Sequence, residues 1–151
     1  MPFSCFHVVD VIDEPEKPLY VLLKGICVPW SFNVVFWVDD QPENNYKYAR
    51  KLEMENISVV FSTTTKQAIA IINIFRWLIY FPDSNLKIVT DMVREENGKM
   101  NYNAGLDLIE ELCMKFKYSF PILCFCSDAV KAKENSENRK LKGNFKITSS
   151  S

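Results

Sequence analysis

Three aspartates follow two predicted strands, and together they have the chemistry of a metal site. Asp39 and Asp40 come directly after the apolar run 33–38, and Asp91 comes directly after the run 86–90. The carboxyl ends of buried strands are where open α/β sheets place their ligand sites. Three carboxylates gathered there would provide a site for a hard cation with a nucleophilic carboxylate beside it. The simpler alternative is that these aspartates only cap the helices that follow.

Alternating strand and helix signals indicate the fold that would bring these aspartates together. Strands are predicted over residues 33–38, 57–61, 86–90, 120–126 and 145–148, helices over 43–56, 66–80, 104–116 and within 127–142, and a polar loop over 92–103. This alternation predicts an α/β fold, a flavodoxin-like, doubly wound parallel five-stranded sheet with strand order 2-1-3-4-5. Its switch point lies between the first and third strands, which are the strands that end at the aspartates.

Residues 1–32 fit the alternation poorly, so we predict an N-terminal extension followed by one domain over residues 33–151. Within the extension, 6–11 and 19–23 are apolar enough for two strands, or for a segment that packs on the sheet. The sequence predicts no helix after the last strand, so the final helix of the fold is apparently missing. An uncovered apolar sheet face would be a large exposed patch. We expect residues 1–32 or a partner chain to cover it.

Composition excludes several classes of function. The chain has 151 residues and a formal net charge of −1, so no basic surface for nucleic acid is indicated. The start does not have the pattern of a signal peptide, and polar or charged residues interrupt both apolar stretches, 19–38 and 67–81, that invite a membrane check. Five cysteines without a Cys-x-x-Cys pair predict buried, reduced thiols in a cytoplasmic protein.

Taken together, residues 33–151 resemble the receiver domains of two-component response regulators. Val38-Asp39-Asp40 is similar to the acidic pair that closes the first strand of these domains. Thr90-Asp91-Met92 is similar to the phosphoacceptor aspartate that closes their third strand. Gly105 matches the family glycine at the start of the next helix, and segments 121–126 and 143–147 resemble strands four and five.

The resemblance implies a chemistry and a set of partners. Asp39, Asp40 and Asp91 would hold one Mg²⁺, with a backbone carbonyl near Val93 completing the protein ligands. Asp91 would attack a phosphohistidine or a small phosphodonor and become an acyl phosphate. A histidine kinase or phosphotransfer protein would be the donor, because His7 is the only histidine of the chain. A homodimer is a further expectation, whereas neither nucleic acid nor membrane is implied as a partner.

Two positions depart from the family pattern. Receivers carry Thr or Ser at the end of strand four, where this chain has Cys126 followed by Ser127. Receivers also carry Lys at the end of strand five, where Ser150 is the nearest residue here. Without that lysine the phosphoryl group loses a charge-assisted contact. Arg94 or Lys99, in the polar loop after Asp91, could supply the missing positive charge, but the sequence favours the alternative of a solvated loop that takes no part in the site.

These departures leave three functions open. The first is a signalling receiver phosphorylated on its aspartate, and the second is a pseudo-receiver that binds partners independently of phosphorylation. The third is a Mg²⁺-dependent phosphohydrolase of the haloacid dehalogenase type, which uses Asp-x-Asp, whereas Asp39 and Asp40 are adjacent. No Gly-rich phosphate loop, nucleophile elbow or His-Glu-x-x-His motif is present. The sequence therefore favours a signalling or interaction domain over an enzyme.

Overall fold

The computed structural model describes residues 8–9, 33–74, 85–116 and 121–149. Its strands are β1 (Val8–Val9), β2 (Asn33–Val38), β3 (Ser58–Ser62), β4 (Asn85–Asp91), β5 (Arg94–Glu96), β6 (Lys99–Asn101), β7 (Ile122–Cys126) and β8 (Phe145–Ser149). Its helices are the 3-10 turn η2 (Pro42–Asn45) and the α-helices α2 (Tyr46–Met54), α3 (Thr65–Ile74), α4 (Ala104–Phe116) and α5 (Ala129–Asn138).

The main sheet has the predicted topology. Its strands lie in the order β1-β3-β2-β4-β7-β8 and every neighbouring pair is parallel. The five predicted strands correspond to β2, β3, β4, β7 and β8, so the order 2-1-3-4-5 is confirmed. β1 adds a short sixth strand, in which Val8 and Val9 pair with Phe61 and Ser62. Residues 10–32 lie outside the described residues, so the role expected of this extension as a cover stays a prediction.

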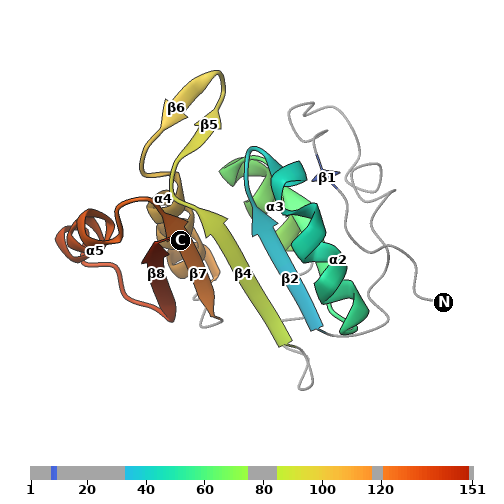
Figure 1. The fold of residues 1–151 in the computed structure, drawn as a ribbon. Helices are drawn as coiled ribbons and strands as arrows, with labels where there is room; N and C mark the ends of the chain where they lie inside the picture. The colour runs from blue at the N-terminus through green and yellow to red at the C-terminus, as the bar shows by residue number, and fades with distance from the viewer. Residues whose placement is uncertain (1–7, 10–32, 75–84, 117–120, 150–151) are drawn as a thin grey trace.

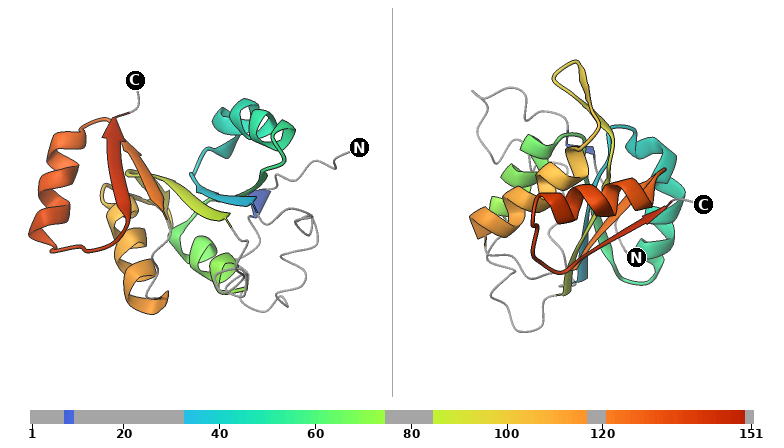
Figure 2. Two further views of the ribbon diagram at one scale, coloured as in Figure 1. Left: turned by 90° about the horizontal axis from the view of Figure 1, so that it is seen from below. Right: turned by 90° about the vertical axis from the view of Figure 1, so that its left-hand side faces the viewer.

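The larger part of the core lies between the sheet and helices α3, α4 and α5. Figures 1 and 2 show α3 and α4 on the face of the sheet opposite to α2, with α5 beside the β8 edge. Alternate residues of β4 and β7 point into this core, which is why Leu86, Ile88 and Ile122 are almost fully buried. They meet a stripe of α4 whose members recur at helical spacing, Leu106, Leu108, Ile109 and Leu112.

The other face of the sheet is covered by α2 over β2 and β3. Val35, Val59 and Phe61 form a second, smaller buried cluster with Ala49 of α2. On β4 and β7 the residues of this face are only half-buried or exposed. Among these residues Val89 of β4 packs against the α2 cluster, so the described helices cover this face mainly over β2 and β3.

The segment predicted as a polar loop after β4 is instead a β-hairpin, so that prediction was wrong. β5 and β6 pair antiparallel, with Arg94 opposite Asn101 and Glu96 opposite Lys99. Asn97 and Gly98 form the turn with φ values of 54° and 75°. Positive φ at both central residues is what an Asn-Gly hairpin turn requires. The hairpin projects beyond the carboxyl end of β4 (Figure 1).

Helix ends differ from the predicted ones for local reasons. The helix predicted over 43–56 begins as η2 at Pro42 and ends at Met54, just before Asn56 adopts a φ of 64°. α5 begins after Asp128, whose side chain accepts a hydrogen bond from the Lys131 backbone N–H at 3.1 Å.

No helix within the described part of the chain is long and apolar enough to cross a bilayer.

Candidate functional site

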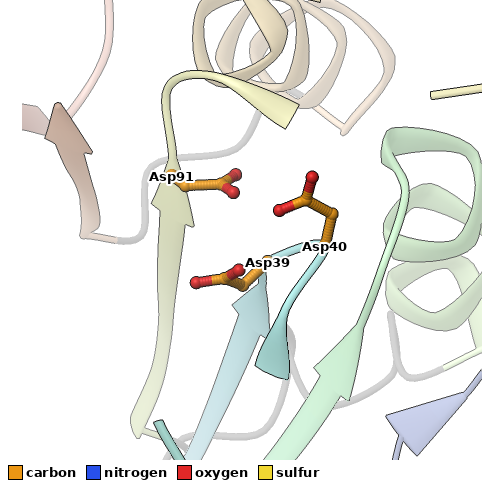
Figure 3. A group of neighbouring side chains, drawn as sticks. All are labelled: Asp39, Asp40 and Asp91. Carbon is orange, nitrogen blue, oxygen red and sulfur yellow. The ribbon is translucent and has the colours of Figure 1, made fainter. Parts of the chain in front are cut away.

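The three predicted aspartates lie together where β2 and β4 end (Figure 3). One carboxylate oxygen from each of Asp39, Asp40 and Asp91 lies within 4.8 Å of the others. β2 and β4 are adjacent, yet the chain passes from β2 to β3 on one side before it returns to β4 on the other. The cluster therefore lies at the topological switch point, where ligands bind in open α/β sheets.

Asp39 has a structural role in addition to its place in the cluster. Its Oδ1 accepts a hydrogen bond from the Gln41 N–H at 2.8 Å, and its Oδ2 accepts one from Asn45 Nδ2 at 2.8 Å. The N-caps of η2 and α2 are Gln41 and Asn45, and neither helix has a side-chain cap hydrogen bond, so Asp39 orders the turn before them and caps neither helix. Burial raises the pKa of Asp39, these two hydrogen bonds oppose the rise, and the neighbouring charge of Asp40 adds to it.

Asp91 is the most strongly perturbed carboxyl of the cluster. Burial, followed by repulsion from Asp39 and Asp40, raises its pKa from 3.8 to about 7, although the Arg94 charge acts in the opposite direction. The side chain is 19% exposed, so it is shielded from most of the water that would stabilise its charge. Three carboxyl groups this close together are a favourable environment for a cation.

Arg94 supplies a buried positive charge on one side of this cluster. Its side chain is fully buried, and its Nη1 donates to Asp91 Oδ1 at 2.5 Å. Its Nε donates to Glu96 Oε1 at 3.1 Å, and its Nη2 donates to Thr65 Oγ1 at 2.8 Å. Burial raises the pKa of Glu96, but hydrogen bonds from Thr65 and the charge of Arg94 outweigh that effect, so this pKa lies below its ordinary value.

The hairpin contacts a second member of the cluster through its backbone. The Glu95 N–H donates to Asp40 Oδ2 at 2.9 Å. Of the two cations suggested by the sequence, the structure brings Arg94 to the aspartates and leaves Lys99 exposed on β6. The dipeptide Asn97-Gly98 was the available sequence signal for this hairpin, but nothing local indicated which hairpin side chain would be buried.

Gly105 allows α4 to begin directly against the end of β4. A Cβ at this position would lie 2.7 Å from the Asp91 carbonyl oxygen and 2.7 Å from Cys124 Sγ, closer than such atoms can approach. The Gly105 N–H donates to the Met92 carbonyl oxygen at 3.1 Å. Because glycine has no Cβ, the start of α4 can lie directly against the end of β4 that carries Asp91.

The donor set fits a hard divalent cation. Three carboxylates within reach of one ion are the oxygen ligands that Mg²⁺ prefers, and their crowding without a cation is unfavourable. A cavity of about 760 Å³ opens at the cluster and is lined by Asp39 and Asp91 together with Trp37, Phe125 and Ser149. The site is therefore accessible from the half-covered face of the sheet.

The other residues singled out from the sequence lie elsewhere. Cys126 is buried, and its thiol donates to the Thr148 carbonyl oxygen at 3.7 Å. Cys126 and Ser127 line a separate cavity of about 310 Å³ beside α5, which also includes Val93. Ser150 lies outside the described residues, and Ser149 is the last described residue of β8. Within the described residues, no lysine lines the cavity at the aspartates except Lys51 of α2.

Comparison with known proteins supports the fold. No model of a known protein family matches the chain, and its sequence matches no curated protein. A response regulator receiver domain protein from Clostridium thermocellum aligns with 78% of this chain and 81% of its own, with a TM-score of 0.53 and 17% identity. The non-phosphorylated HemR receiver domain from Leptospira biflexa aligns with 76% of this chain and 80% of its own, with a TM-score of 0.51 and 21% identity. The chain therefore has the fold of a response regulator receiver domain.

Proposed function

We propose that residues 33–151 form a receiver-like signalling domain in which Asp91 accepts a phosphoryl group. The observation that carries this proposal is the gathering of Asp39, Asp40 and Asp91 within 4.8 Å at the switch point of a receiver fold. Asp39, Asp40 and Asp91 would together hold one Mg²⁺. When bound there, the ion would offset the repulsion between the carboxylates and an incoming phosphoryl group.

The residues of the chain account for the transfer step. Asp91 Oδ1 is held by Arg94, which leaves Oδ2 to attack phosphorus. The new bond joins Oδ2 to phosphorus, and the bond from phosphorus to the donor breaks, with its electron pair leaving on the donor. A phosphohistidine of another protein or an acyl phosphate such as acetyl phosphate would serve as the donor. Histidine kinases and phosphotransfer proteins are therefore the partners that we propose.

A pseudo-receiver is the second candidate, and it has its own observations. The Cys126 thiol donates a hydrogen bond to the Thr148 carbonyl oxygen. At the corresponding position a receiver would present a hydroxyl group to the phosphoryl group. β8 ends in Ser149, without a cation. In this alternative the same fold would bind its partners without accepting phosphate.

Intact-mass spectrometry after incubation with acetyl phosphate and Mg²⁺ tests the proposal. We expect the parent to gain one phosphoryl group and Asp91→Asn to gain none. Asp40→Asn should gain it more slowly, since it retains the nucleophile but loses a metal ligand. A folded parent that stays unmodified with Mg²⁺ would favour the pseudo-receiver. Repeated turnover of a phosphomonoester would favour the phosphohydrolase instead.

A further inference from the structure

Arg94 is an unusual residue to find inside this domain. It is the largest fully buried side chain among the described residues. A guanidinium has five N–H donors, and here all five have an acceptor. Nε bonds to Glu96, and the two terminal nitrogens bond to a set of four partners, Thr65 Oγ1, Thr90 Oγ1, Asp91 Oδ1 and the Ala104 carbonyl oxygen.

This network holds the guanidinium in one place. Burying a charge is unfavourable unless it is paired and hydrogen-bonded, and Arg94 meets both conditions through elements far apart in the sequence. Thr65 begins α3, Glu96 ends β5, and the Glu96 carboxylate also accepts the Thr65 backbone N–H at 2.5 Å. A position that only filled the core could hold an apolar side chain without the desolvation cost of a buried charge, so a functional role is the natural explanation for an arginine here.

We propose that Arg94 supplies the positive charge of the phosphoacceptor site, entering from the β5–β6 hairpin in place of a lysine at the end of β8. This inference rests on the proposed function, and it assigns the residue that would stabilise the negative charge of the phosphorylated Asp91. Arg94 Nη1 holds Asp91 Oδ1 and so directs the free oxygen, Oδ2, toward the donor. The same charge stays beside the aspartate after the phosphoryl group has been attached.

The charges of the site support this role. Asp39, Asp40 and Asp91 place three carboxyl groups together, and the Arg94 charge offsets part of their negative charge before any metal binds. The guanidinium therefore has two opposite effects. It weakens the attraction of the carboxylates for a divalent cation, and it favours a phosphoryl group on Asp91, which adds further negative charge. A residue that only filled the core would not produce both effects.

Arg94→Gln separates these effects, and Lys99→Gln is the matched control because it removes a positive charge from the same hairpin at an exposed position. Isothermal titration with Mg²⁺ alone would measure metal affinity, and intact mass with acetyl phosphate would measure phosphoryl uptake. For Arg94→Gln we expect Mg²⁺ to bind about tenfold more tightly and uptake to be at least about tenfold slower, as for the loss of a charged hydrogen bond. Lys99→Gln should match the parent in both.

A circular dichroism melt of each variant identifies a loss of folding. Should Arg94→Gln fail to fold, Arg94→Lys tests the proposal in its place. Lysine keeps the positive charge but lacks the planar guanidinium that can bond to several acceptors at once. We therefore expect its Mg²⁺ affinity to lie within about threefold of the parent's and its phosphoryl uptake to be slower. Uptake by a folded Arg94 variant at or above the parent's rate would overturn the proposal, as would unchanged Mg²⁺ affinity in Arg94→Gln. A parent that takes no phosphoryl group rejects the proposed function, and the Mg²⁺ titration still decides whether Arg94 acts as the counter-charge.

Discussion

Replacing Asp91 by asparagine should remove a loss of stability that the metal-free parent undergoes as the pH rises toward neutrality, although it also removes the proposed phosphoacceptor and the ion-pair partner of the buried Arg94. Burial and repulsion from Asp39 and Asp40 raise the pKa of Asp91 from 3.8 to about 7 in the folded chain. In the unfolded chain this pKa returns to its ordinary value. The folded state therefore binds the Asp91 proton more tightly than the unfolded state does.

The sign of the pH dependence follows from that difference. Below pH 3.8 Asp91 is neutral in both states, so the stability associated with its neutral form is fully present. As the pH rises toward about 7, the unfolded state has lost the proton that the folded state still holds, and this stability is lost. Each unit of pKa difference corresponds to about 1.4 kcal/mol. Three units give an upper limit of about 4 kcal/mol in the free energy of unfolding.

Urea unfolding followed by circular dichroism, with a chelator present, measures this quantity. Because asparagine does not titrate, the stability of the parent minus that of Asp91→Asn isolates the effect. We expect this difference to become less favourable to the parent by up to about 4 kcal/mol between pH 4 and pH 8. A matched variant, Asp107→Asn, changes a carboxylate that is 40% exposed on α4 and should show no such trend.

Mg²⁺ should shift the parent-minus-variant difference at pH 8 toward the parent. An ion that binds only the folded state stabilises it by mass action, and the parent offers three carboxylates where Asp91→Asn offers two. A parent-minus-variant difference that stays constant from pH 4 to pH 8 would refute the argument from burial and repulsion. A difference that turns in favour of the parent as the pH rises, without metal, would also refute it.

Three further substitutions test how the fold supports the site. Gly105→Ala should destabilise the chain by about 1–3 kcal/mol in urea unfolding, because its Cβ would lie 2.7 Å from the Asp91 carbonyl oxygen. Phe61→Ala should cost about 3–5 kcal/mol in the same assay, since Phe61 is fully buried under α2, and a smaller loss would mean that the cluster repacks. Arg139→Ala breaks the pair with Asp107, at 2.7 Å between partly exposed side chains, so thermal melts in low salt should show a loss below about 1 kcal/mol that disappears in high salt.

The strand order and the place of the acidic cluster could be predicted because both depend on short-range patterns. Mostly apolar runs of four to seven residues mark the strands, and right-handed crossovers leave few arrangements for them. The carboxyl ends of parallel strands all lie at one edge of the sheet. An aspartate that follows β2 and one that ends β4 must therefore be neighbours once those strands pair.

The hairpin after β4 was missed although its turn signal was present. Asn97-Gly98 is a favoured hairpin turn, but the strands on either side are three residues long and mostly polar. Such short strands have no alternation of apolar and polar residues from which to predict them. Their pairing depends on contacts with the rest of the molecule, including the hydrogen bond from Glu95 to Asp40.

The sequence by itself determined which residues are the acids of the site and which strands carry them. The strands are recognised from the pattern of apolar residues within short segments, and the strand order follows from the alternation of strands and helices along the chain. Only the tertiary structure decided which basic side chain contacts these acids. Arg94 and Lys99 were equal candidates in the sequence, and the packing of the hairpin against Thr65 of α3 buries the first and leaves the second in water. That choice depends on partners some thirty positions apart in the sequence, and local patterns carry no information about such contacts.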